Sequence, residues 1–194
     1  MRSIRAVVAA AALGGVALTA GFGVALATGD DDRSARRAVA ALRDTTGQHV
    51  GVAVFKERHG EVSVRASVWR LAPGFHGFHV HAVGECVPPF TSAAGHFNPS
   101  GAGHGDHAGD LPSLLVNEDG TGELGFVTDR FSLADLFDAD GSALMVHAGR
   151  DNFANIPSRY QSQPAGTFGP DAETLATGDA GGRVACGVVQ RPGN

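Results

Sequence analysis

Strict alternation of apolar and polar residues is the feature that most constrains how this chain can fold. From Glu61 to Val68 the even positions hold valine or alanine, and the odd positions hold glutamate, serine or arginine. Valines at 50, 52 and 54 alternate with smaller or aromatic residues just before it, and Arg58-His59-Gly60 can turn the chain. Side chains on a β-strand point to opposite faces in turn, so this pattern predicts a hairpin whose second strand buries one face.

Further short apolar segments predict more strands, which are Phe78 to His81, Leu114 to Val116, Glu123 to Thr128, Ala143 to His147 and Arg183 to Val189. The turn Glu118-Asp119-Gly120 predicts that the second and third of these pair as a hairpin, and Ser132 to Asp135 matches a capping box that can open one helical turn. The 28 glycines are roughly twice the average usage, which favours many turns. We therefore expect an all-β fold, a Greek-key sandwich or barrel of about eight antiparallel strands.

Two long segments, Cys86 to Leu111 and Gly149 to Gly182, show no periodicity. Loops of this length inside a compact domain are usually functional. We expect both to contribute to a site.

The beginning of the chain is typical of an exported protein. A basic start with Arg2 and Arg5 precedes an apolar stretch from Ala6 to Ala27 that ends in Ala-Leu-Ala, which predicts a signal peptide over residues 1–27. An uncleaved N-terminal anchor is the alternative, because the apolar stretch could just span a bilayer. Either arrangement predicts export, to the periplasm, the cell envelope or the medium.

A polar tether over residues 28–47 is expected to lead into a folded domain over residues 48–194. Within the tether, the residues from Ala35 to Leu42 could form a helical turn or two. Export favours a disulfide between Cys86 and Cys186, with two free thiols as the alternative. Loss of residues 1–27 would change the net charge from -5 to -7, because it removes Arg2 and Arg5 and no acid. Neither nucleic acid nor an acidic membrane is an expected partner.

Histidine is concentrated in one part of the sequence, because seven of the nine histidines lie between His76 and His147. Neutral imidazole is a common ligand of copper and zinc, so this density indicates a metal site rather than scattered surface residues. His79 and His81 are two apart on a predicted strand and point to one face, so they can bind one ion together. His147 ends an apolar strand and is a third candidate ligand, with a satisfied core histidine as the alternative.

A second group, His104, His107 and Asp110, lies in a glycine-rich stretch that disfavours a helix. Two imidazoles and one carboxylate form a zinc-like set that needs a fourth ligand. His96 is the candidate, and its two ring nitrogens could serve both metals at once once both protons are gone.

Four blocks of sequence together resemble the copper/zinc superoxide dismutase family; they are Gly74 to His81, Gly95 to Pro99, His107 to Leu111 and Gly178 to Val188. The similarity runs from about Val50 to Val189 with every block in order. The stretch from His147 to Cys186 is especially similar to exported actinobacterial members.

The resemblance implies a copper site of His79, His81, His96 and His147, and a zinc site of His96, His104, His107 and Asp110. It further implies that Asp151 joins His79 to His104, that Cys86 and Cys186 form the family disulfide, that Arg183 lies above the copper, and that His76 is structural. His49 and His59 have no such role and are expected to be exposed. The implied reaction converts superoxide to oxygen and hydrogen peroxide through a Cu(II)/Cu(I) cycle, in which His96 takes up a proton and zinc holds His96.

Two departures from the family stand out. Val87-Pro88-Pro89-Phe90 is inserted after Cys86 relative to eukaryotic members, which leaves open whether the chain is a monomer or a homodimer. Ala176 stands where the family's guiding lysine is usual, so attraction of the anion must come from the local field of Arg183. An exported module that buffers or delivers copper fits the ligands equally well but has no need for Arg183. A metal-free structural sandwich is disfavoured, because clustered histidines would repel one another on protonation.

Overall fold

The computed structural model describes residues 36–163 and 166–193, and the regular secondary structure of this part of the chain is mainly β-strand. Its strands are β1 (Arg36–Asp44), β2 (His49–Arg58), β3 (Glu61–Val68), β4 (Gly74–His76), β5 (Phe78–His81), β6 (Leu114–Val116), β7 (Gly122–Thr128), β8 (Ala143–His147) and β9 (Arg183–Val188). Short helical turns are η1 (Thr91–Ala93), η2 (Asp135–Phe137) and α1 (Thr174–Thr177). The all-β prediction is confirmed. The expected signal peptide, residues 1–27, lies outside the described residues.

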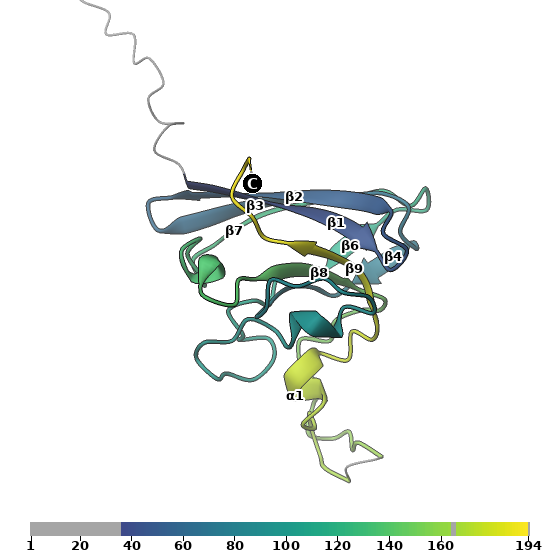
Figure 1. Cartoon of the computed structure of the whole chain (residues 1–194). Coiled ribbons are helices and arrows are strands. Elements are labelled where there is room, and N and C mark those ends of the chain that lie inside the picture. Colours follow the sequence, from purple (N-terminus) through teal and green to yellow (C-terminus); the bar gives the residue numbers. More distant parts are fainter. Residues whose placement is uncertain (1–35, 164–165, 194) are drawn as a thin grey trace, which may run out of the picture. The chain divides into compact units, whose positions relative to one another are not determined.

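Seven strands form one curled antiparallel sheet in the order β5-β8-β9-β1-β2-β3-β7, and β4 and β6 form a separate two-stranded sheet. Figure 1 shows β2 and β3 on one side of this arrangement and β8 and β9 on the other. Apolar side chains from both sides meet in one buried core, which includes Phe55 of β2, Val64 of β3, Phe78 of β5 and Val146 of β8. Curling therefore lets a single sheet bury its own inner face.

The predicted hairpin is β2 and β3, paired from Arg58↔Glu61 to Gly51↔Val68. The even positions of β3 are buried, as its alternation predicts. On β2 the fully buried side chains include Ala53 and Phe55, while Val52 and Val54 are only partly buried. Ser132 and Asp135 form the predicted capping box, with Ser132 N–H donating to Asp135 Oδ2 at 2.8 Å and Asp135 N–H to Ser132 Oγ at 3.3 Å. The turn that follows is η2.

The prediction of a polar tether over residues 28–47 is wrong for residues 36–44, which form β1. Ala38, Ala40 and Leu42 are fully buried in the core, and β1 pairs with β2 along its length and with β9 at its end. The possible helical turn at residues 35–42 is likewise absent from the described residues. Alanine favours helices in isolation, so the small buried face of this strand gave a weak sequence signal.

The predicted hairpin between residues 114–116 and 123–128 is also wrong. The turn is present, with Gly120 N–H donating to Asn117 O at 2.9 Å. However, β6 pairs with β4, a strand that the sequence did not predict, and β7 pairs with β3. The chain therefore passes from one sheet to the other at this turn. Each of the two strands pairs with a strand from an earlier part of the chain.

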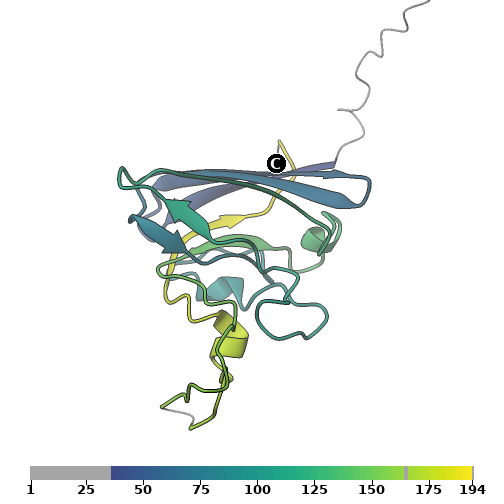
Figure 2. The same cartoon turned by 180° about the vertical axis from the view of Figure 1, so that it is seen from behind.

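The two long aperiodic segments lie together at one side of the fold. Figures 1 and 2 both show α1 and the adjoining loop extending away from β1, β2 and β3, on the far side of β8 and β9. Two isolated bridges, His79↔Asp110 and His81↔His96, join the first segment directly to β5. Within the described residues, no helix is long and apolar enough to cross a membrane.

Candidate metal centre

The structure brings together every residue that the sequence predicted as a metal ligand. His79 and His81 lie on β5, and His147 ends the neighbouring strand β8. These residues form two groups, and within each group the ligand atoms lie within 4.8 Å of one another. The first group is His79, His81, His96 and His147, and the second is His96, His104, His107 and Asp110; all of these residues are buried. His96 belongs to both groups, as the sequence predicted.

Hydrogen bonds fix the orientation of the strand-borne histidines. The Nδ1–H of His81 donates to Ala94 O at 2.9 Å, and the Nδ1–H of His147 donates to Gly181 O at 3.0 Å. A carbonyl can only accept, so Nδ1 carries the proton in each ring and Nε2 keeps its lone pair. The two Nε2 atoms lie 3.4 Å apart. Two facing lone pairs are the arrangement that a cation between them would stabilise.

The glycine-rich loop surrounds the carboxylate of Asp110. Oδ1 of Asp110 lies 2.9 Å from His96 Nδ1, 3.2 Å from His107 Nδ1 and 3.3 Å from His104 Nδ1. Its Oδ2 accepts the backbone N–H of Gly105 at 2.7 Å and of His107 at 3.1 Å. One oxygen thus faces three imidazole nitrogens while the backbone holds the other. Because His96 uses Nδ1 here, its Nε2 remains for the first group.

Asp151 forms a hydrogen bond with one histidine of each group. Nε2–H of His79 donates to its Oδ2 at 2.6 Å, and Nε2–H of His104 donates to its Oδ1 at 2.7 Å. In the neutral form of each ring, this bond leaves Nδ1 unprotonated and turned inward. Among the described residues, His79 Nδ1 and His104 Nδ1 are buried without a hydrogen-bond partner. Such orphaned acceptors are costly unless they bind an ion, so the donor set fits one metal in each group.

Gly178 is a residue at this site that sequence reasoning did not single out. Its φ is +60°, and a Cβ there would lie 2.1 Å from His104 Nε2 and 2.2 Å from Asp151 Oδ1. No larger residue fits without displacing the hydrogen bond between these two side chains. The glycine falls in the block Gly178 to Val188, but only the fold reveals that a carboxylate and an imidazole lie against it.

Burial dominates the electrostatics of the strand-borne histidines. It lowers the pKa of His79 to about 4, of His81 to about 2 and of His147 to about 3. The positive charge of Arg183 also lowers the pKa of His81 and His147. These three side chains are therefore neutral at pH 7, which is the form of imidazole that binds a metal.

On the loop side the carboxylates reverse this behaviour at His104 but not at His107, whose pKa burial lowers. Burial alone would lower the pKa of His104, but hydrogen bonds and charges from Asp110 and Asp151 raise it to about 9. Burial would raise the pKa of both carboxyl groups, yet their histidine partners hold both well below the ordinary range. An ion that binds this group must displace a proton that the carboxylates hold in place.

Arg183 begins β9 next to the first group. Its Nη1 donates to Phe90 O at 2.6 Å and its Nη2 to Ala94 O at 2.5 Å. The same Ala94 carbonyl accepts from His81, so one peptide group positions both the guanidinium and a ligand. The predicted disulfide joins Cys86 to Cys186, and neither cysteine is free.

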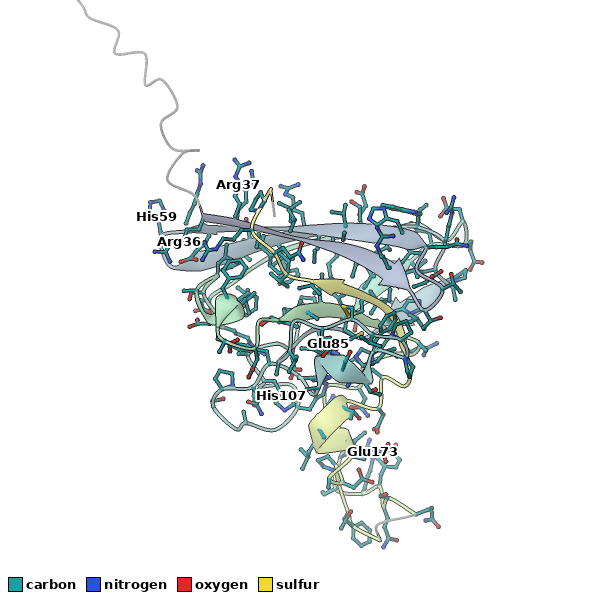
Figure 3. The ribbon with its side chains drawn as sticks, in the orientation of Figure 1. Arg36, Arg37, His59, Glu85, His107 and Glu173 are labelled. Carbon is teal, nitrogen blue, oxygen red and sulfur yellow. A yellow bond between two sulfur atoms is a disulfide. The ribbon has the colours of Figure 1, made fainter. Side chains whose placement is uncertain are left out.

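The remaining histidines lie where the sequence placed them, outside both groups. His76 is buried, and its two ring nitrogens contact the carbonyls of His147 and Ala72 at 2.6 and 2.8 Å. His49 and His59 are exposed. Figure 3 shows His59 near Arg36 and Arg37, at the opposite side of the fold from His107.

Comparison with known proteins agrees with this geometry. The family model of copper/zinc superoxide dismutase matches residues 49–189. The chain is 43% identical to "Superoxide dismutase [Cu-Zn]" of Mycolicibacterium paratuberculosis, over 76% of this chain and 71% of that protein. It is 42% identical to the protein of the same name from Mycobacterium tuberculosis, over 84% of this chain and 74% of that protein.

Solved structures extend the comparison. A double mutant of a SOD-like protein from Bacillus subtilis aligns with a TM-score of 0.63 and 32% identity, covering 77% of this chain and 95% of that one. The clock protein EA4 aligns with a TM-score of 0.65 and 30% identity, covering 81% and 95%. The fold and the paired ligand groups define a two-metal β protein. This chain belongs to the copper/zinc superoxide dismutase family.

Proposed function

We propose that this protein converts two superoxide anions and two protons into oxygen and hydrogen peroxide. The observation that carries the proposal is the position of His96, whose ring joins a four-histidine group to a group of three histidines and one carboxylate. His79, His81, His96 and His147 would hold copper, and His96, His104, His107 and Asp110 would hold zinc. Copper, when bound, supplies a one-electron cycle between Cu(II) and Cu(I), whereas zinc supplies a charge without redox chemistry.

The residues around these metals have separate tasks. Nε2 of His96 is the atom that can hold a proton for the peroxide product, because Nδ1 is turned toward the loop group. Arg183 offers a permanent charge and hydrogen-bond donors to an incoming anion. The carbonyls of Phe90 and Ala94 hold this guanidinium beside the copper group. Asp151 fixes the tautomers of His79 and His104, so that each presents Nδ1 to its metal.

The competing function is an exported module that buffers or delivers copper and zinc. Arg183 argues against it, because a partly buried guanidinium next to a copper ligand weakens cation binding and favours an anion. A buffer would gain by losing that charge.

Superoxide decay in the presence of the metal-loaded protein tests the proposal. We expect rapid decay for the parent protein and a rate about tenfold or more lower for Arg183→Ala, with one copper and one zinc retained in each. Arg65→Ala, an exposed arginine on β3, is the matched control and should decay superoxide as fast as the parent. No activity in the fully loaded parent would leave the buffering function as the better account.

The disulfide and the 34% identity to "Extracellular superoxide dismutase [Cu-Zn]" of Brugia pahangi support export. We propose that residues 1–27 are either a signal peptide that is cleaved or an N-terminal anchor that is kept. Mass spectrometry of the mature protein distinguishes the two, because cleavage would place the new N-terminus at Thr28. Sedimentation of the same material determines whether it is a monomer or a homodimer.

A further inference from the structure

Arg130 makes a connection to the loop of the zinc group that the function described above does not use. It follows β7, and its Nη1 donates to the carbonyl of Gly105 at 3.0 Å and to that of His107 at 3.2 Å. These are the same two residues whose backbone N–H groups donate to Oδ2 of Asp110. One guanidinium nitrogen thus holds both residues that orient the carboxylate.

The loop needs such a restraint because its sequence gives it little stiffness. It lies outside the strands and helices of the described chain and carries glycine at 101, 103, 105 and 109. Glycine leaves the backbone free to take many conformations. Gly105 is also confined from its other side, since a Cβ there would lie 2.8 Å from Phe153 O. The Phe153 ring stacks on His104, with centroids 6.4 Å apart.

The ion pair between Arg130 and Asp106 does not explain this arrangement. Arg130 Nη2 lies 4.0 Å from Asp106 Oδ1, and the Asp106 side chain is 88% exposed. Exposed pairs of this kind contribute little. The bonds to the two carbonyls are shorter, and His107 is buried.

We propose that Arg130 is a positioning residue for zinc, which acts by fixing Gly105 and His107 so that Asp110 keeps one oxygen turned toward the three histidines. The inference rests on the proposed zinc assignment. It assigns retention of zinc to a residue whose Nη1 donates to two loop carbonyls and that lies 20 residues beyond Asp110 in the sequence.

Release of zinc from the copper- and zinc-loaded protein to an excess of chelator tests this role. Removing a partner of a ligand typically weakens metal binding 10- to 100-fold, so we expect Arg130→Ala to release zinc about tenfold faster than the parent. Arg130→Met keeps much of the apolar part of the arginine side chain but removes its N–H donors, so it should release zinc as fast as Arg130→Ala. Arg130→Lys retains a donor and should lie between. Asp106→Asn and Arg65→Ala are controls that should match the parent.

Copper release, measured in the same experiment, separates positioning from general destabilisation. We expect copper release to change much less than zinc release in all variants, because three of the four proposed copper ligands, His79, His81 and His147, lie on strands. Zinc release from Arg130→Ala and Arg130→Met within about twofold of the parent would overturn the inference, given the tenfold change expected. Equal acceleration of both metals would also overturn it. A parent that takes up no zinc would overturn the zinc assignment itself, which is a distinguishable result.

Discussion

The proposed copper group and the proposed zinc group use the same kinds of side chain on very different backbones. His79, His81 and His147 are on β5 and β8, which pair within a seven-stranded sheet. The zinc group's own ligands, His104, His107 and Asp110, come from a glycine-rich loop. Strand pairing fixes the backbone of the first set, and hydrogen bonds to Ala94 O, Gly181 O and Asp151 orient its rings. The second set depends on side-chain hydrogen bonds, from Asp110, Asp151 and Arg130.

The electrostatics of the two groups differ most clearly at His104, because burial also lowers the pKa of the loop histidine His107. On the sheet, burial keeps the imidazoles neutral, with pKa values of about 4 for His79 and about 3 for His147. On the loop, carboxylates raise the pKa of His104 to about 9. A redox site benefits from ligands that are already neutral and fixed. A structural ion can replace the proton that otherwise holds the carboxylates and imidazoles together.

The largest expected effect comes from removing one ligand on each side. His81→Ala should lose copper and reduce superoxide decay to background, a fall of at least about a hundredfold, because even changes beyond the ligands reach that size. His107→Ala should lose zinc, keep copper and retain more activity. Elemental analysis and superoxide decay measure both. Loss of zinc before copper in His81→Ala would contradict the division of ligands between the two sites.

Asp151→Asn tests the connection between the two sides. An amide can accept from only one of the two ring N–H groups that Asp151 now accepts at 2.6 and 2.7 Å. We expect zinc affinity to fall about 10- to 100-fold and copper affinity to fall less, because β5 still positions His79. Chelator competition for each metal measures this. Asp140→Asn, at an exposed aspartate, is the control; equal losses of both metals would show that the sheet does not protect the copper side.

Gly178→Ala separates close packing from backbone strain. Gly178 and Gly166 have φ values of +60° and +65°, but a Cβ at 166 would meet nothing within 4 Å. Both changes strain the backbone, whereas only Gly178→Ala also overpacks against His104 and Asp151. We expect it to lower the free energy of unfolding by about 1–3 kcal/mol more than Gly166→Ala. Denaturant unfolding of the metal-free variants measures the difference, and equal losses would refute the packing argument.

Ser132→Ala gives the smallest expected effect, because it changes a turn rather than a proposed ligand or a partner of one. It removes the side-chain half of the capping box before η2, which should cost about 1 kcal/mol of stability. Metal content and activity should stay unchanged. Thermal unfolding with elemental analysis checks both statements, and a change in zinc content would mean that η2 also supports the loop.

Periodicity made most strands predictable, because a half-buried strand shows its inner face in the sequence, as the valines of β3 do. Spacing alone paired His79 with His81. The chain's own residues were less informative where the buried face is small, as at Ala38 and Ala40 of β1. The sequence also did not indicate which strands pair with each other. The pairing of β6 with β4 joins segments that are far apart in the chain.

The side chains that could bind metals were predictable from the amino-acid sequence, because ligand chemistry belongs to the residue. The division of these residues between strands and a glycine-rich loop was predictable as well. The resemblance already implied that Asp151 joins His79 to His104, whereas the room that Gly178 leaves for Asp151 and the contact of Arg130 with the loop came from the folded structure alone. Each of these relations joins residues far apart in the chain. Distances between such residues are set by how the sheet curls and packs, and no local pattern records them.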